Sequence, residues 1–283
     1  MRALAELVMR GQKHAAVVAV VAALLPLLYW ISAAAVALVT LRRGPSDGAG
    51  LLVWAILPAG VWTYSGDPTP LVVIAGTYVL AILLRQTVSW PRVLMLALPL
   101  GALMALLLET ALSGVIGQMV EMTQQLLEQS TTSAEADKLL TTETLNAILV
   151  GGLSAVHTAM ILLSLILARS WQSGLYNPGG FQQEFHQMRL PATYTALLLA
   201  ALVLGSQVGL EIWRWLPLVL LPWIICGIAL IHGSVAKRDL GRSWLVGFYL
   251  AVVFFGPYMI LLLVAAAVLD SFVDFRSRMP VKN

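Results

Sequence analysis

AAVVAVVAALLPLLYWISAAAVALVTL, residues Ala15–Leu41, contains no Asp, Glu, Lys or Arg. Seven further stretches without these residues follow it, at 49–66, 68–84, 93–108, 144–168, 193–210, 215–236 and 243–269. A bilayer core about 30 Å thick needs roughly 20 apolar residues for each crossing helix, whereas the surface of a soluble protein needs charge. The eight runs therefore predict an all-α fold. We expect a polytopic integral membrane helix bundle with 8–10 transmembrane or half-membrane helices, forming a single transmembrane domain over residues 1–283.

The composition is that of a membrane protein. Of the 283 residues, 59% are hydrophobic and 11% are charged, whereas a soluble domain carries about 25% charged residues. The net charge of +3 comes from Lys and Arg that flank the apolar runs, and no basic stripe with interleaved aromatic residues indicates a nucleic-acid partner. Cys226 is the only cysteine, which excludes an intrachain disulfide and a cysteine metal centre.

The first and last runs are each too long for one ordinary span, and each has a proline near its middle. Pro26 and Gly256-Pro257 are either kinks within single helices or the bends of two helical hairpins. Hairpins place 15 of the 17 Lys and Arg residues on one side of the membrane, together with both termini. Because basic loops stay in the cytoplasm, the pattern favours hairpins and cytoplasmic termini.

One sizeable hydrophilic segment lies on the opposite side, at residues 119–143. We expect an acidic external loop there, reached by a helix that continues from the fourth run past Glu109 toward Gln118. Its charged residues are Glu121, Glu128, Glu135, Asp137, Lys138 and Glu143.

Two surfaces are candidates for partner contact. In the cytoplasmic loop 169–191, Phe181 and Phe185 share a helical face with Met188, which predicts an amphipathic helix in the membrane interface. This helix either only anchors the chain or docks a cytoplasmic partner. The second surface is a strip of small residues spaced by four in the first run, which lets helices pack closely within the chain or against a membrane partner. The strip consists of Ala15, Ala19 and Ala23.

Polar side chains within the runs are candidates for ligand binding, because their burial in a bilayer is unfavourable. His157 lies at the middle of run 144–168, where it either lines a polar solute site or hydrogen-bonds a neighbouring helix. Glu109 follows Arg92 by about 26 Å of helix, which places it near the outer interface. There we expect it to be an interfacial acid alone or to join Asn146 and Gln118 in a polar cluster.

Motifs of catalysis and of metal binding are absent from the sequence. It contains no His-Glu-x-x-His, no glycine-flanked nucleophilic serine, no P-loop and no pair of intramembrane aspartates. His14, His186 and His232 lie near predicted membrane edges and do not indicate a metal site. We therefore expect a protein that is not an enzyme, without catalytic residues, metal ions or cofactors. A membrane enzyme without a familiar motif is the third hypothesis.

Two segments carry a resemblance to a known family. The resemblance is to the YybS-like family of bacterial membrane proteins. It is carried by LYNPGGF (Leu175–Phe181) with Glu184 and Phe185, and by LDSFVDFR (Leu269–Arg276). The general run of segments is similar to that family over nearly the whole chain. This resemblance implies a bacterial inner-membrane protein and assigns no activity or site residues. The family is distantly similar to the substrate-binding S components of energy-coupling-factor transporters and to the rod-shape protein MreD.

Two main hypotheses of function follow. The first is a non-enzymatic inner-membrane protein that binds a small solute, similar to an S component, and needs a membrane coupling protein for active transport. The alternative is a cell-envelope or morphogenesis scaffold similar to MreD. A solute binder predicts a closed polar pocket near His157 or under residues 119–143. A scaffold predicts a filled interior and a partner at Phe181, Phe185 or Ala19.

Overall fold

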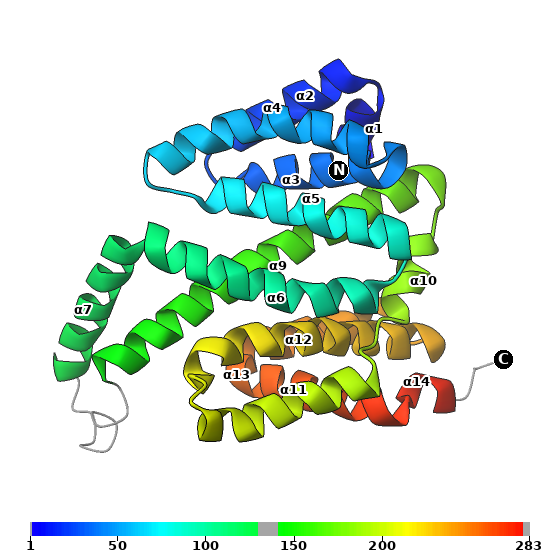
Figure 1. Ribbon diagram of the computed structural model, residues 1–283. Coiled ribbons are helices and arrows are strands. Elements are labelled where there is room, and N and C mark those ends of the chain that lie inside the picture. The colour runs from blue at the N-terminus through cyan, green and yellow to red at the C-terminus, as the bar shows by residue number, and fades with distance from the viewer. Residues whose placement is uncertain (1, 130–140, 280–283) are drawn as a thin grey trace.

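The computed structural model describes residues 2–129 and 141–279, and this part of the chain is helical, with no strand (Figure 1). The helices are α1 (Arg2–Met9), α2 (Gln12–Leu24), α3 (Tyr29–Arg43), α4 (Pro45–Tyr64), α5 (Thr69–Thr87), α6 (Trp90–Ala111), α7 (Ser113–Gln129), α9 (Thr142–Tyr176), α10 (Gly180–His186), α11 (Ala192–Leu204), η1 (Gly205–Val208), α12 (Ile212–Lys237), α13 (Arg242–Val273) and α14 (Phe275–Arg278). The predicted all-α helix bundle is confirmed.

Five helices of the described residues are long and apolar enough to cross a membrane, namely α5, α6, α9, α12 and α13. In the first four, 44–50% of the most apolar segment is buried inside the bundle, and the remainder faces outward. A helix with apolar side chains on both its inner and outer faces is compatible with a membrane protein, because lipid covers the outer face.

The centre of the bundle is formed by α3 and α9. Of the fifteen residues of α3, eleven are buried, and many of them are alanines whose small side chains let neighbouring helices approach closely. The 35-residue α9 contacts α3 and α5 on one side and α12 on the other, so it joins the N-terminal and C-terminal helices into one bundle.

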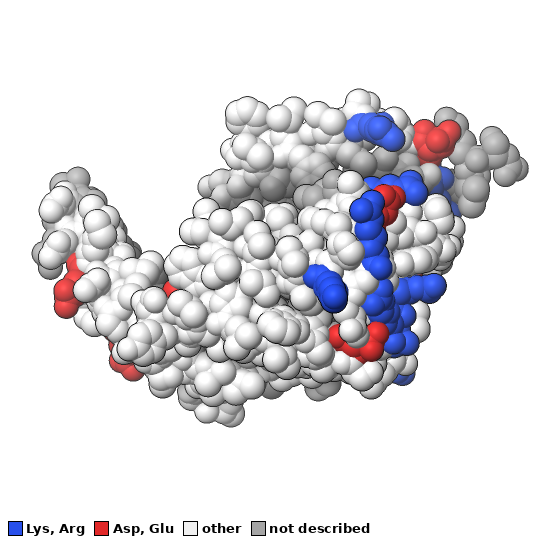
Figure 2. Space-filling view, turned by 90° about the horizontal axis from the view of Figure 1, so that it is seen from above, with Lys and Arg blue, Asp and Glu red and all other residues white. Residues whose placement is uncertain are grey.

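Charge divides the molecule into two ends. Fourteen of the fifteen described Lys and Arg residues lie at the end where α4 begins and α12 ends, which we call the basic end. The opposite end, which we call the acidic end, contains Arg214 together with Asp67, Glu109, Glu121, Glu143 and Glu211. Figure 2 shows the blue residues gathered at the basic end beside a broad uncharged belt.

The first long run is a hairpin, as the charge pattern favoured. Helix α2 ends at Leu24 and α3 begins at Tyr29, on either side of Pro26, and Leu27 has a positive φ of 62°. At the basic end, Nη2 of Arg43 donates to the backbone oxygen of Met9, which brings the end of α3 back to the start of α2. The single-span alternative is therefore wrong for this run.

The last run also folds back. Helix α13 is interrupted at Gly256, whose φ of 38° and ψ of −110° are not helical. In the first arm, the hydroxyl of Tyr249 forms a hydrogen bond of 2.8 Å with Nε2 of His232 near the end of α12. The second arm returns to the basic end, and just beyond it Nζ of Lys237 donates to the backbone oxygen of Arg276 at 2.5 Å. Both ends of α13 thus lie at the basic end, which confirms the hairpin alternative.

The fourth run does not continue as one protruding helix. Helix α6 ends at Ala111, and α7 begins at Ser113 in a new direction, from the end of α6 toward the start of α9 at the acidic end (Figure 1). Ile116 and Val120 of α7 are buried against the first turns of α9, so the predicted loop 119–143 begins as packed helix. The remainder of that loop, 130–140, lies outside the described residues.

Candidate functional site

His157 is buried, and both nitrogens of its ring are engaged within the chain. Nδ1 lies 2.7 Å from the backbone oxygen of Leu153, and Nε2 lies 3.1 Å from the hydroxyl oxygen of Thr69. A neutral ring with the proton on Nδ1 donates to Leu153 and accepts from Thr69, which leaves no ring nitrogen for a solute. Because Thr69 is the first residue of α5, His157 lies toward the acidic end rather than midway along the bundle.

Glu109 forms an ion pair with Arg214 between α6 and α12. The two guanidinium Nη atoms bond the two carboxylate oxygens, Nη1 to Oε1 at 3.2 Å, and Nη1 also lies 3.7 Å from a carboxylate oxygen of Glu211. Gln118 is exposed on α7 and Asn146 is half-buried on α9. Among the described residues no hydrogen bond joins either of them to Glu109, whose carboxylate pairs with Arg214 instead, and the polar cluster of these three residues stays a prediction.

The alanine strip packs within the chain. Ala15, Ala19 and Ala23 are 2%, 0% and 0% exposed, because this face of α2 lies on α3 and α4. The indole nitrogen of Trp62 in α4 donates to the backbone oxygen of Ala23 at 3.0 Å, which satisfies a carbonyl at the end of α2. A partner therefore has no access to the strip, and the docking hypothesis for these alanines is wrong.

The predicted amphipathic helix exists as α10, but its apolar face is turned inward. The ring of Phe181 lies 6.0 Å from that of Trp90 and 5.8 Å from that of Phe185, which in turn lies 5.6 Å from His232. Met188, which follows α10, is 1% exposed. This aromatic row packs α10 onto α9 and α12, so the two phenylalanines are not an open docking surface.

Glu184 fixes α10 to the ends of α6 and α9. Nε of Arg169 donates to its Oε2 at 3.0 Å, Nη2 of Arg169 bonds Oε1, and the indole nitrogen of Trp90 donates to Oε2 at 3.1 Å. Burial opposes ionisation, but the hydrogen bonds from Arg169 and Trp90 and the charge of Arg169 outweigh it and lower the pKa of Glu184. The carboxylate is thus ionised at neutral pH and holds the loop in place.

The segment Leu269–Arg276 contacts the residues that directly follow Phe185 at the basic end. Arg276 donates to the backbone oxygens of His186 at 2.7 Å and Met188 at 3.1 Å, and to Oδ2 of Asp270 at 2.6 Å. Asp270 is 2% exposed and also accepts from the backbone nitrogen of Phe275 at 2.9 Å. An open polar cavity of about 620 Å³ adjoins this contact, with a lining that includes Gln183, His186, Arg189, Lys237, Asp274 and Arg276.

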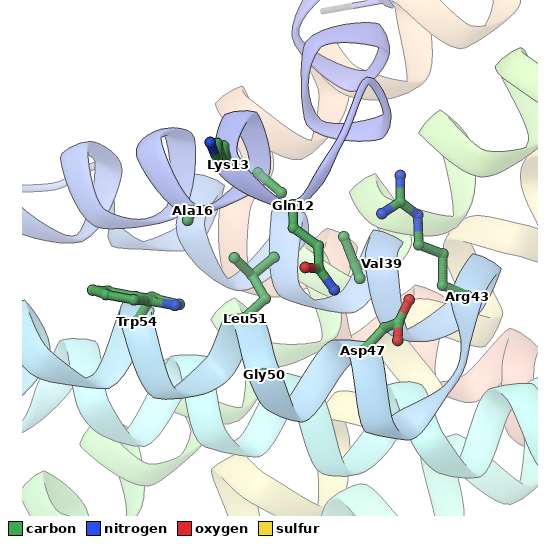
Figure 3. Close-up of a pocket in the computed structure, with 10 residues that line it drawn as sticks. Gln12, Lys13, Ala16, Val39, Arg43, Asp47, Gly50, Leu51 and Trp54 are labelled. Atoms are coloured by element: carbon green, nitrogen blue, oxygen red, sulfur yellow. The ribbon is translucent and has the colours of Figure 1, made fainter.

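A recess with both polar and apolar walls lies between α2, α3 and α4, and we call it the α2–α4 groove (Figure 3). Its volume is about 300 Å³. It is lined by Gln12, Lys13, Ala15, Ala16, Val39, Arg43, Asp47, Gly50, Leu51 and Trp54.

The polar part of the groove faces the basic end. The side chain of Gln12 points from α2 toward α4, where Asp47 lies in the first turn (Figure 3). Trp54 follows Asp47 by seven residues, or about 10 Å of helix, and with Leu51 it forms the apolar part. A Cβ on Gly50 would meet no atom within 4 Å, so the missing side chain at this position keeps the groove open.

The groove is not predicted from the apolar character of run 49–66, because Asp47 lies just before that run. Asp47, Leu51 and Trp54 are spaced by four and three residues, which places them on one helical face. This shared face, together with the basic residues Lys13 and Arg43 near the ends of the first run, is the feature of the sequence that indicates the groove.

The histidines of the basic end approach each other without forming a metal centre. The rings of His186 and His232 lie 6.5 Å apart, whereas His14 is exposed on α2. Over residues 2–129 and 141–279, no group of three or more His, Cys, Asp or Glu side chains has the arrangement to hold a metal ion. Comparison with known family models, curated proteins and solved structures finds no match to this chain.

Proposed function

We propose that the chain is a non-enzymatic integral protein of a bacterial inner membrane, with its basic end in the cytoplasm. The distribution of charge supports this orientation, because Lys and Arg near apolar helices are retained on the cytoplasmic side and are attracted to its anionic lipids. Helices α1 and α14 both lie at the basic end, so both termini are cytoplasmic in this proposal.

The proposed activity is the binding of a small amphipathic solute with an anionic group in the α2–α4 groove. The observation that carries it is the combination in one recess of an apolar wall and a polar mouth, where two cations, Lys13 and Arg43, outnumber the one carboxylate, Asp47. Lys13 and Arg43 supply positive charge at the mouth. The first turn of α2 adds backbone N–H groups, because its N-cap, Gly11, offers no side chain to satisfy them. Leu51 and Trp54 provide contact for the apolar part of the solute.

Transport is a further step of the same proposal. The chain would then be the solute-binding subunit, similar to an S component, and a separate membrane protein would supply the energy, since the sequence has no P-loop. This subunit would release its solute only with that partner present.

The test compares two glycine variants of α4. Gly50 lines the groove and Gly60 does not, and an added Cβ meets no atom within 4 Å at either position. We expect mass spectrometry of the purified protein to detect an amphipathic molecule with the wild type and with Gly60→Leu, and at least ten-fold less of it with Gly50→Leu. Equal amounts with all three proteins, or none with any, would contradict solute binding in the groove.

The scaffold remains a second candidate because one observation favours it. Leu153 and Thr69 engage both ring nitrogens of His157, so this ring is packed within the chain, as expected of a filled bundle. A scaffold predicts that an envelope protein stays bound to the purified chain and that Gly50→Leu leaves this complex intact.

A further inference from the structure

The two arms of α13 are short for a membrane crossing. The first, Arg242 to Phe255, has a length of about 21 Å, and the second, Pro257 to Val273, about 25 Å, whereas the hydrocarbon core is about 30 Å thick. Both arms have their outer ends at the basic end, so the depth that the bend reaches in the membrane is measured from that end.

The contact of α13 with α12 gives the depth of the bend. A Cβ built on Gly227 would lie 2.7 Å from the backbone oxygen of Leu263, so these two residues are at the same level. Pro257 precedes Leu263 by six residues, and the second arm runs parallel to α12, so the bend is level with Leu221. Helix α12 continues for nine more residues beyond that level, to Ile212, which is about 14 Å. The bend therefore stops well short of the acidic end.

The residues at the bend are suited to lipid rather than water. Val253, Phe254 and Tyr258 are 77%, 78% and 75% exposed. By contrast, the connection between α4 and α5 at the acidic end, Ser65–Pro68, has the polar sequence SGDP. Proline at the bend also removes one backbone N–H that would otherwise need a partner in hydrocarbon.

The outer flanks of α13 are also largely uncovered. Only 11% of its most apolar segment is buried, compared with 44–50% in the other four long helices. The outward side chains are apolar or aromatic along both arms, including Trp244, Leu250, Leu261 and Leu262.

We infer that α13 is a re-entrant hairpin that enters the bilayer from the basic side and ends inside the hydrocarbon. Lipid chains of the basic-side leaflet surround its arms, and lipid of the opposite leaflet covers its tip. Because arms of about 21 and 25 Å exceed half of a core about 30 Å thick, the hairpin occupies the whole depth of the basic-side leaflet and only part of the opposite one. This surface is independent of the α2–α4 groove and of any solute bound there.

The test is accessibility and depth of single cysteines in a Cys226→Ala background, which removes the only native cysteine. Ser243→Cys marks the basic side, Ser206→Cys marks the acidic side, and Phe254→Cys marks the tip. With oriented vesicles and a membrane-impermeant maleimide, we expect each marker to react from its own side only. The tip should react from neither side until detergent is added.

A fluorophore attached at Phe254→Cys through a permeant reagent then reports its depth. We expect lipids brominated in mid-chain to quench it at least two-fold more than aqueous iodide does. Reaction of Phe254→Cys from the acidic side would overturn the inference, because the hairpin would then cross the bilayer. Weak quenching by every brominated lipid, or efficient disulfide cross-linking of Phe254→Cys between two copies, would also overturn it, because protein rather than lipid would cover the tip.

Discussion

Arg276 connects the C-terminal end of the chain to the loop after α10, and its removal should be strongly destabilising. Substitution by Met keeps an unbranched apolar side chain but removes three hydrogen bonds and leaves Asp270 buried without its cation. Breaking one partner of a buried ion pair costs about 3–5 kcal/mol. Because the Arg276 side chain is 12% exposed, we expect the lower value of about 3 kcal/mol, or roughly a hundred-fold in the unfolding equilibrium constant.

The assay is unfolding of the purified protein by SDS in mixed micelles, followed by far-ultraviolet circular dichroism. Arg278→Met is the matched control, because Arg278 lies on the same short helix and is exposed. Adding Asp270→Asn to Arg276→Met should recover more than 1 kcal/mol, since the uncompensated charge is removed. A difference below about 0.5 kcal/mol between Arg276→Met and Arg278→Met would refute the buried ion pair as a fixing contact.

Two further substitutions test the remaining contacts. Glu184→Gln should destabilise the protein at pH 7, and the difference from wild type should shrink as the pH falls. The lowered pKa of Glu184 means that its stabilising effect is complete above its ordinary pKa of 4.5 and is lost as the pH falls through the folded-state value. Denaturant titrations from pH 7 to about pH 3 measure this, and a difference that stays constant as the pH falls below 4.5 would contradict the pairing with Arg169. His157→Leu should lower the free energy of unfolding by about 1–2 kcal/mol, because it leaves the hydroxyl of Thr69 unpaired. The yield of any co-purified amphiphile should stay unchanged. A selective loss of that amphiphile would show that His157 binds it.

The hairpins could be predicted from the sequence because two independent signals agreed. Run length and proline position allowed a bend at Pro26 and at Gly256-Pro257, and the distribution of Lys and Arg selected that alternative. The depth of each bend could not be predicted, because it depends on the register between neighbouring helices. That register is visible only in contacts such as the one between Gly227 and Leu263.

The candidate site was harder to predict, because polar residues in a helix bundle find partners far away in the chain. Glu109 and Arg214 are 105 residues apart and pair directly. The spacing of the alanine strip correctly indicated close helix packing, but periodicity does not distinguish packing within the chain from packing against a partner. The same limit applies to Phe181 and Phe185, whose half-buried side chains pack against the core of the bundle.

The orientation on which the proposed function rests can be tested in intact cells. In the Cys226→Ala background, Ser65→Cys lies in the turn at the acidic end and Ser277→Cys lies in α14 at the basic end, and both positions are exposed. We expect an impermeant thiol reagent to modify Ser65→Cys in intact cells and Ser277→Cys only after the cells are permeabilised. Modification of Ser277→Cys in intact cells would contradict a cytoplasmic basic end, and with it the proposed orientation of the chain in the membrane.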